Sequence, residues 1–183
     1  MFGFGKKRSG RELVEALHTR VVEASRRPEL YEGAGVPDTM EGRFEALTLH
    51  VLVVLRRLRQ LPLPAEDVAQ ELVDSVFAHL EIALREMGIG DFGVPKRMKK
   101  LAGAFFDRTS KYDALIARGD VDGLAAEVAQ RLAADPASLR PFAAVVIASE
   151  DKLADADLEG ILKGPAFASV AESRRILTVE TNT

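Results

Sequence analysis

The sequence predicts an all-α protein: a single helical domain of about six helices with a smaller C-terminal helical extension. Apolar residues recur three and four positions apart along most of the chain, and no segment alternates as a strand would. Stretches rich in glycine and proline, such as "YEGAGVPDTMEG" and "GIGDFGV", separate these segments. Hydrophobic residues make up 47% of the 183 residues, which is enough for one buried core.

The first predicted helix runs from Ser9, a residue type suited to capping a helix N-terminus, to about Arg27. Its expected buried face carries Leu13, Leu17 and Val21, which are spaced four residues apart. Residues 1–9 are expected to be flexible.

The second helix, predicted over 39–60, is expected to run through the core. Asp38 and Glu41 have the spacing of a capping box at its N-terminus. Its middle, "ALTLHVLVVL", is apolar on nearly every side. The segment "PLP" ends this helix, and a third helix follows at about 65–87. Its predicted buried face comprises Val73, Val76, Phe77, Leu80, Leu84 and Met87.

The fourth helix is predicted to begin near Pro95, because proline suits the first turn, and to end at about Arg118. Its buried face would carry Met98, Leu101, Ala102, Phe105, Thr109 and Tyr112. Two further helices are expected at about 121–133 and 139–149. We therefore assign a helical core to 10–133, a helical extension to 134–176 and a disordered tail to 177–183.

The composition excludes several classes of function. The chain has no cysteine, which rules out disulfides, thiol catalysis and metal sites built on cysteine. A net charge of −3 means that any basic surface must be local, and no DNA partner is expected. The N-terminus lacks the apolar run of a secretory signal, and no apolar stretch reaches the ~20 residues that span a bilayer. We expect a cytoplasmic protein that can lie against the inner face of the cytoplasmic membrane.

Four basic residues stand at the predicted start of the fourth helix, in "MGIGDFGVPKRMKK" (87–100). Lys96, Arg97, Lys99 and Lys100 have no acidic residue three or four positions away along the helix, and their charge opposes the helix dipole. Local stability therefore does not explain the cluster. Either acidic residues from elsewhere neutralise it, for example from 150–159, or it contacts an anionic partner such as a phosphate backbone, a lipid surface or an acidic peptide.

The three histidines give little support to a metal site. His18, His50 and His79 fall on three different predicted helices, and no two have the four-residue spacing of a helical metal site. His50 lies in an apolar run, where a histidine hydrogen-bonded within the core is the favoured interpretation. No metal or cofactor is expected.

No catalytic motif is present. The chain lacks G-x-S-x-G and a Walker A loop, and "GIGDFG" neither follows a strand nor has the glycine spacing of a dinucleotide-binding loop. We therefore expect no enzymatic activity. Gly103, inside the fourth helix, is either a tolerated glycine or a position where another helix packs closely.

Two stretches together resemble a known family. They are "LYEGAGVPDTMEGRFEALTLHVLVVLRRL" (30–58) and "LREMGIGDFGVPKRMKKLAGAFFDRTSKYDAL" (84–115), and they are similar to the bacterial branch of the ubiquinol–cytochrome c chaperone family. The resemblance covers about residues 10–133 well and the C-terminal part loosely. It implies a helical, non-enzymatic protein that assists assembly of respiratory complex III by binding newly made cytochrome b.

Several residues match the family by position: Asp38, Thr39, Arg43, Phe44, His50, Gly90, Gly93, Lys96, Met98, Lys99 and the segment from Phe106 to Tyr112. The chain differs from eukaryotic members in having no tryptophan before Phe44 and no long N-terminal extension with a mitochondrial targeting signal. The resemblance therefore implies neither ribosome tethering nor the partner subunit of the mitochondrial system.

The predicted partner-binding residues are Lys96, Arg97, Lys99, Lys100, Gly103, Phe106, Asp91, Arg43 and His50. As a cytochrome b chaperone, the protein would place Phe106 in an apolar groove and set its basic segment against the client's loops, anionic lipid or a ribosome. The alternative is an RNA- or ribosome-binding module that uses the basic helix 95–111. A helical enzyme with a metal at its histidines is a third hypothesis. The sequence does not predict the oligomeric state.

Overall fold

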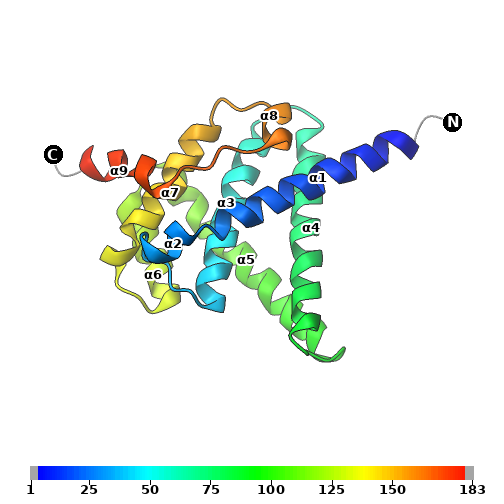
Figure 1. The fold of residues 1–183 in the computed structure, drawn as a ribbon, viewed down its shortest axis with the longest axis horizontal. Coiled ribbons are helices and arrows are strands. Elements are labelled where there is room, and N and C mark those ends of the chain that lie inside the picture. The colour runs from blue at the N-terminus through cyan, green and yellow to red at the C-terminus, as the bar shows by residue number, and fades with distance from the viewer. Residues whose placement is uncertain (1–3, 180–183) are drawn as a thin grey trace.

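The computed structural model describes residues 4–179, which form nine helices joined by short loops (Figure 1). No strand occurs within this range, so the prediction of an all-α fold is confirmed. The helices are α1 (Phe4–Ser25), α2 (Pro28–Glu32), α3 (Met40–Arg59), α4 (Ala65–Glu86), α5 (Gly93–Ala117), α6 (Val121–Leu132), α7 (Pro136–Leu153), α8 (Leu158–Lys163) and α9 (Val170–Val179).

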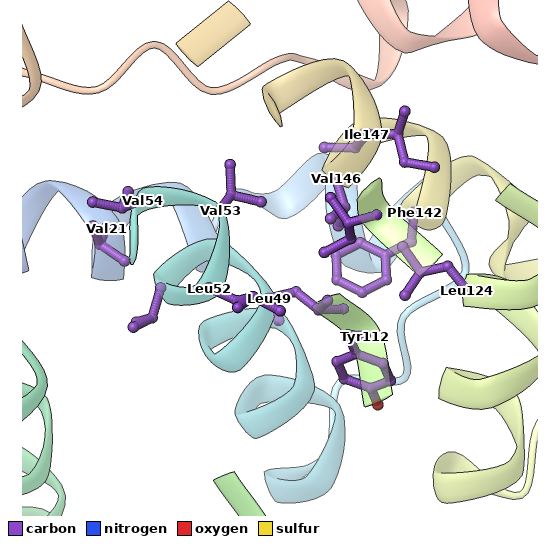
Figure 2. Close-up of a cluster of buried hydrophobic side chains, with 14 of the residues drawn as sticks. Val21, Leu49, Leu52, Val53, Val54, Tyr112, Leu124, Phe142, Val146 and Ile147 are labelled. Carbon is purple, nitrogen blue, oxygen red and sulfur yellow. The ribbon is translucent and has the colours of Figure 1, made fainter. Parts of the chain in front are cut away.

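Helix α3 is the centre of the core, as its sequence predicts. It packs against α1, α4, α5 and α7, and nearly all of its middle residues are buried. Figure 2 shows Leu49 of α3, next to Leu52, extending toward Tyr112 of α5 and Phe142 of α7. These side chains are each 0% exposed, so three helices share one apolar interior.

The beginnings of three helices differ from the prediction. Helix α1 begins at Phe4 rather than at Ser9, and the short helix α2, which the sequence did not predict, begins at Pro28 just after the end of α1. The cap of α3 is Thr39, whose hydroxyl accepts a hydrogen bond of 3.1 Å from the Gly42 N–H. Asp38 is therefore not the capping residue; its carboxylate pairs with Arg43 instead.

Two residues predicted to be buried are exposed. Leu13 on α1 is 42% exposed, because the buried face of α1 is the one that carries Val14, Leu17 and Val21, and Met87 after α4 is 48% exposed. Both residues fit the apolar periodicity, but periodicity does not report whether a facing helix is present.

The C-terminal segment docks on the core. Helix α7, capped by Asp135, is longer than predicted and carries nine buried residues, among them Phe142 and Val146. Helix α9 packs on α7, and the Ala168 N–H before it donates to the buried Ser149 hydroxyl at 2.9 Å. Helix α9 continues to Val179, within the segment predicted as a disordered tail; residues 1–3 and 180–183 lie outside the described range.

Candidate functional site

An apolar groove lies where four helices meet: the end of α1, the start of α3, the end of α4 and the first half of α5. Its cavity has a volume of about 250 Å³. Its apolar walls include Val22, Phe44, Leu47, Leu80, Leu84 and Leu101. The groove is thus assembled from segments that are distant in the sequence, so no single motif predicts it.

Exposed lining residues form the rim of the groove. Met40 is 61% exposed and Met87 is 48% exposed, and Arg26 and Arg43 add positive charge beside them. Methionine side chains are flexible and polarisable, so they adapt to apolar partners of different shape. Exposed apolar side chains at a concave surface are typical of an interaction site.

Arg43, one of the predicted partner-binding residues, is held in place at this rim. Its Nε donates to the Asp38 carboxylate at 2.7 Å, and its guanidinium lies 5.9 Å from the centroid of the Tyr31 ring. These contacts hold the guanidinium of an exposed arginine that also lines the groove.

A buried charge pair supports the wall formed by α3 and α5. The Glu45 carboxylate is fully buried and accepts hydrogen bonds from the Arg108 guanidinium and, at 2.7 Å, from the Tyr112 hydroxyl. Arg108 also lies over the ring of Phe44, 5.1 Å from its centroid. Burial and the adjacent carboxylate raise the pKa of Tyr112, so this residue stays protonated and remains a donor.

Helices α4 and α5 form a hairpin that projects from the body of the molecule (Figure 1). The tip of the hairpin is the loop 87–92, in which Phe92 is completely exposed. Arg85 pairs with Glu81 at 2.8 Å and with Asp91, which connects the end of α4 to the loop. Asp91, one of the predicted partner-binding residues, is thus paired with Arg85 while its side chain stays 88% exposed.

The four cations predicted as a binding cluster stand on α5 directly after this tip. Lys96, Arg97, Lys99 and Lys100 are all exposed, and none forms an ion pair with another residue of the described chain. We call these four residues the basic cluster.

The interpretation that the acidic stretch 150–159 neutralises the basic cluster is wrong. Glu150 accepts a hydrogen bond of 2.9 Å from Arg56, and Glu159 pairs with Lys163. In Figure 1 the end of α7 and all of α8 lie at the opposite side of the molecule from the hairpin tip.

Gly103 and Phe106, also predicted to bind a partner, lie on exposed surface of α5. A Cβ placed on Gly103 would meet no atom within 4 Å, so no described helix packs closely there. Phe106 is 59% exposed and stacks on Phe77 of α4, with ring centroids 6.4 Å apart. With about 3.6 residues per turn, Phe106 and the groove residue Leu101 lie on opposite flanks of α5. Phe106 is not part of the groove lining.

His50 is a core residue, which corrects its prediction as a partner-binding residue. It is 2% exposed, its Nδ1 donates to the Ala46 carbonyl at 2.7 Å, and its ring lies 5.0 Å from that of Phe167. Burial lowers the pKa of His50 to about 4, so the ring is neutral. Because its surroundings are packed, the ring does not reach the surface.

The structure brings the other two histidines together, which the sequence analysis did not predict. The rings of His18 on α1 and His79 on α4 are stacked, with centroids 4.1 Å apart, and Glu15 lies beside them. The sequence indicated only that Glu15 and His18, three residues apart, share one face of a helix, because His79 belongs to another helix.

Comparison with known proteins decides the family. Residues 32–169, more than half of the chain, match the family described as Ubiquinol-cytochrome C chaperone. The chain belongs to this family. Its fold is also similar to the crystal structure of the Cbp3 homolog from Brucella abortus, with a TM-score of 0.79 and 33% sequence identity over 92% of this chain and 96% of that one. A search of curated proteins finds no match.

The chaperone family thus confirms the resemblance seen in the sequence. The matched range contains the whole α4–α5 hairpin and every groove residue except those of α1. Among the described residues, no helix of the chaperone is both long enough and apolar enough to cross a bilayer.

Proposed function

We propose that this chaperone assists assembly of complex III by holding an apolar segment of newly made cytochrome b in the groove between α1, α3, α4 and α5. The observation that supports the proposal is the apolar groove, with its methionine rim, in a member of the ubiquinol–cytochrome C chaperone family. The proposed activity is binding and shielding, without catalysis.

The size of the groove indicates how a client would bind. A cavity of about 250 Å³ accepts a few large side chains rather than a complete helix. An amphipathic or membrane-spanning helix lying across the groove would insert anchor residues on one face, which is a common mode of helix recognition. Burial of apolar area contributes roughly 25 cal/mol per Å², so a few anchors give reversible binding, as release of a client requires.

The basic cluster would act beside the groove and not inside it. Exposed cations orient a partner and accelerate its association more than they add affinity. Newly inserted cytochrome b would present polar loops next to its apolar segments, and the headgroups of the surrounding lipid would lie beside them. We therefore assign the chaperone a working position at the cytoplasmic face of the membrane, with the basic cluster against anionic groups of the client or the lipid.

An RNA- or ribosome-binding function is the second candidate, and the unpaired basic cluster is the observation that favours it. Further along α5 the cations are paired: Lys111 lies 3.8 Å from Asp107 and 3.7 Å from Glu127, and Arg108 binds Glu45. The unpaired positive surface of helix 95–111 is therefore confined to its first two turns. Phosphate contacts lose affinity steeply with salt, whereas apolar contacts do not, so salt dependence separates the two candidates.

Complementation of a deletion strain tests the proposal. Met87→Asp places a charge at the rim of the groove, and Ile82→Asp is the matched control. Ile82 stands on the same hairpin arm and is 51% exposed, close to the 48% of Met87, but does not line the groove. We expect Ile82→Asp to restore assembled complex III, measured by native electrophoresis and the haem b spectrum, and Met87→Asp to restore much less. Equal restoration by two equally abundant variants would contradict the groove as the site.

A further inference from the structure

We propose that Glu15, His18 and His79 form a binding site for a divalent transition-metal ion, with Zn²⁺ as the reference ion, that joins α1 to α4. One ligand atom from each residue lies within 4.8 Å of the other two. Two imidazole nitrogens and one carboxylate oxygen suit zinc and its neighbours in the first transition row, and not Ca²⁺ or Mg²⁺, which prefer oxygen ligands.

The helices place the three side chains together. Glu15 and His18 are three residues apart, so both project from the same face of α1. His79 comes from α4, which packs directly against α1. The two imidazole rings are close to parallel, with an interplanar angle of 26°, and the Nε2 of His79 lies 3.8 Å from Oε2 of Glu15.

Ser75, one turn before His79 on α4, orients two of the three ligands. Its carbonyl accepts a hydrogen bond of 2.9 Å from Nδ1 of His79, which puts the ring proton on Nδ1 and leaves the lone pair on Nε2. Its hydroxyl donates to Oε1 of Glu15 at 3.0 Å, which leaves Oε2 available. Support of this kind, in which the second ring nitrogen of a histidine binds a backbone carbonyl, is typical of metal-binding histidines.

His18 adds the third ligand from the buried side of the cluster. Its side chain is 6% exposed, and its ring stacks on the ring of His79. A metal ion held with Glu15 and His79 would bind a nitrogen of the His18 ring.

The site requires only side-chain movement to close on an ion. Tetrahedral zinc with bonds of about 2.0–2.1 Å brings its ligand atoms to roughly 3.4 Å of one another. Glu15 and His79 have side chains that are 56% and 48% exposed, so packing leaves room for both to tilt toward His18, with a fourth position left to water. The ion would then fix α1 against α4 one turn from the groove, because His18 precedes Val22 and His79 precedes Ala83 by four residues.

Zinc titration of the full chain tests this proposal. The protein is prepared without a histidine tag and freed of metal with a chelator, and Zn²⁺ alone is added in a calorimeter. We expect one ion per chain and a higher melting temperature in its presence. We expect His79→Gln and Glu15→Gln each to weaken zinc binding at least tenfold. Glu23→Gln, an exposed carboxylate on the same helix, should bind zinc as the wild type does.

The absorption spectrum of bound Co²⁺ reports metal coordination directly, so it would not change if the three residues only stabilised the fold. Co²⁺ in a tetrahedral site gives visible absorption bands, which we expect for the wild type and for Glu23→Gln but not for His79→Gln. Circular dichroism verifies that each variant is folded. Absence of saturable zinc binding, or unchanged affinity in His79→Gln or Glu15→Gln, would overturn the proposal. The metal site does not depend on the proposed client. Neither result of the zinc experiment therefore supports or contradicts the proposed chaperone function, which the complementation experiment tests.

Discussion

The Tyr112 hydroxyl on α5 donates a hydrogen bond of 2.7 Å to the buried carboxylate of Glu45 on α3. Arg108, one turn before Tyr112, binds the other oxygen of the same carboxylate. This arrangement fixes the register of α5 against α3 directly behind Phe44, a wall residue of the groove. The helix that carries the basic cluster is thereby anchored at its middle while its N-terminal end projects.

We expect Arg108→Met to destabilise the protein by about 3–5 kcal/mol, because it leaves the Glu45 charge buried without its partner. The free energy of unfolding in urea measures the effect. Arg59→Met is the control. Arg59 is 59% exposed and forms a long surface ion pair of 3.7 Å with Asp113, so its loss should cost less than about 1 kcal/mol. The double variant Arg108→Met/Glu45→Met should recover part of the loss. Equal stability of Arg108→Met and Arg59→Met would contradict the role given to the buried pair.

The prediction for Phe106 follows from its position on the flank of α5 away from the groove. Phe106→Asp should lower stability modestly, since it removes the stacking on Phe77, but should leave client binding nearly intact. Met87→Asp should instead leave stability nearly unchanged and strongly reduce client binding. Binding is measured by capture of cytochrome b from solubilised membranes and stability by thermal melting. Loss of capture with Phe106→Asp alone would move the binding surface to the flank that holds Phe77.

The charge of the basic cluster should affect association and its salt dependence. We expect Lys96→Glu/Lys99→Glu/Lys100→Glu to slow client association several-fold at low salt and to have little effect at high salt. Arg174→Glu/Arg175→Glu, on exposed positions of α9, controls for charge reversal elsewhere. Capture of ribosomes or RNA by the wild type, lost in the first variant and without cytochrome b, would favour the second candidate function.

His50 gives the protein a stability that depends on pH. Its folded-state pKa of about 4 is below the value of 6.5 for a free histidine, so the unfolded state binds more protons between these values. Stability is complete above pH 6.5 and falls as the pH is lowered toward 4, with a loss of about 2 kcal/mol by pH 5. In His50→Leu this part of the dependence should disappear, as urea unfolding at neutral pH and near pH 5 would show. An unchanged slope would mean that the ring is protonated in the folded protein.

The sequence predicted α3, α4, α5 and α6 to within about two residues at each end. Each has a long apolar periodicity and is bounded by glycine or proline. Helices α2, α8 and α9 were missed because they are short and depend on tertiary contacts, such as the bond of 2.5 Å from Arg27 to the Ala168 carbonyl.

The candidate site was predicted less completely than the fold. The basic cluster could be read from the sequence because its members are neighbours on one helix. The groove could not, because Val22, Phe44, Leu84 and Leu101 meet only after four helices pack. The proximity of His18 and His79 could not be predicted for the same reason, because it arises only when α1 packs on α4. Met87 shows the limit of periodicity, since it continues the apolar face of α4 yet is 48% exposed at the rim of the groove.

Capture of cytochrome b from detergent-solubilised native membranes tests the central claim most directly. Wild type, Met87→Asp and Ile82→Asp are compared at equal concentration, and circular dichroism melts verify that all three fold. The proposed function predicts that wild type and Ile82→Asp recover cytochrome b and that Met87→Asp recovers at least fivefold less. Equal recovery by all three proteins, or recovery by none, would contradict the claim that the groove holds cytochrome b.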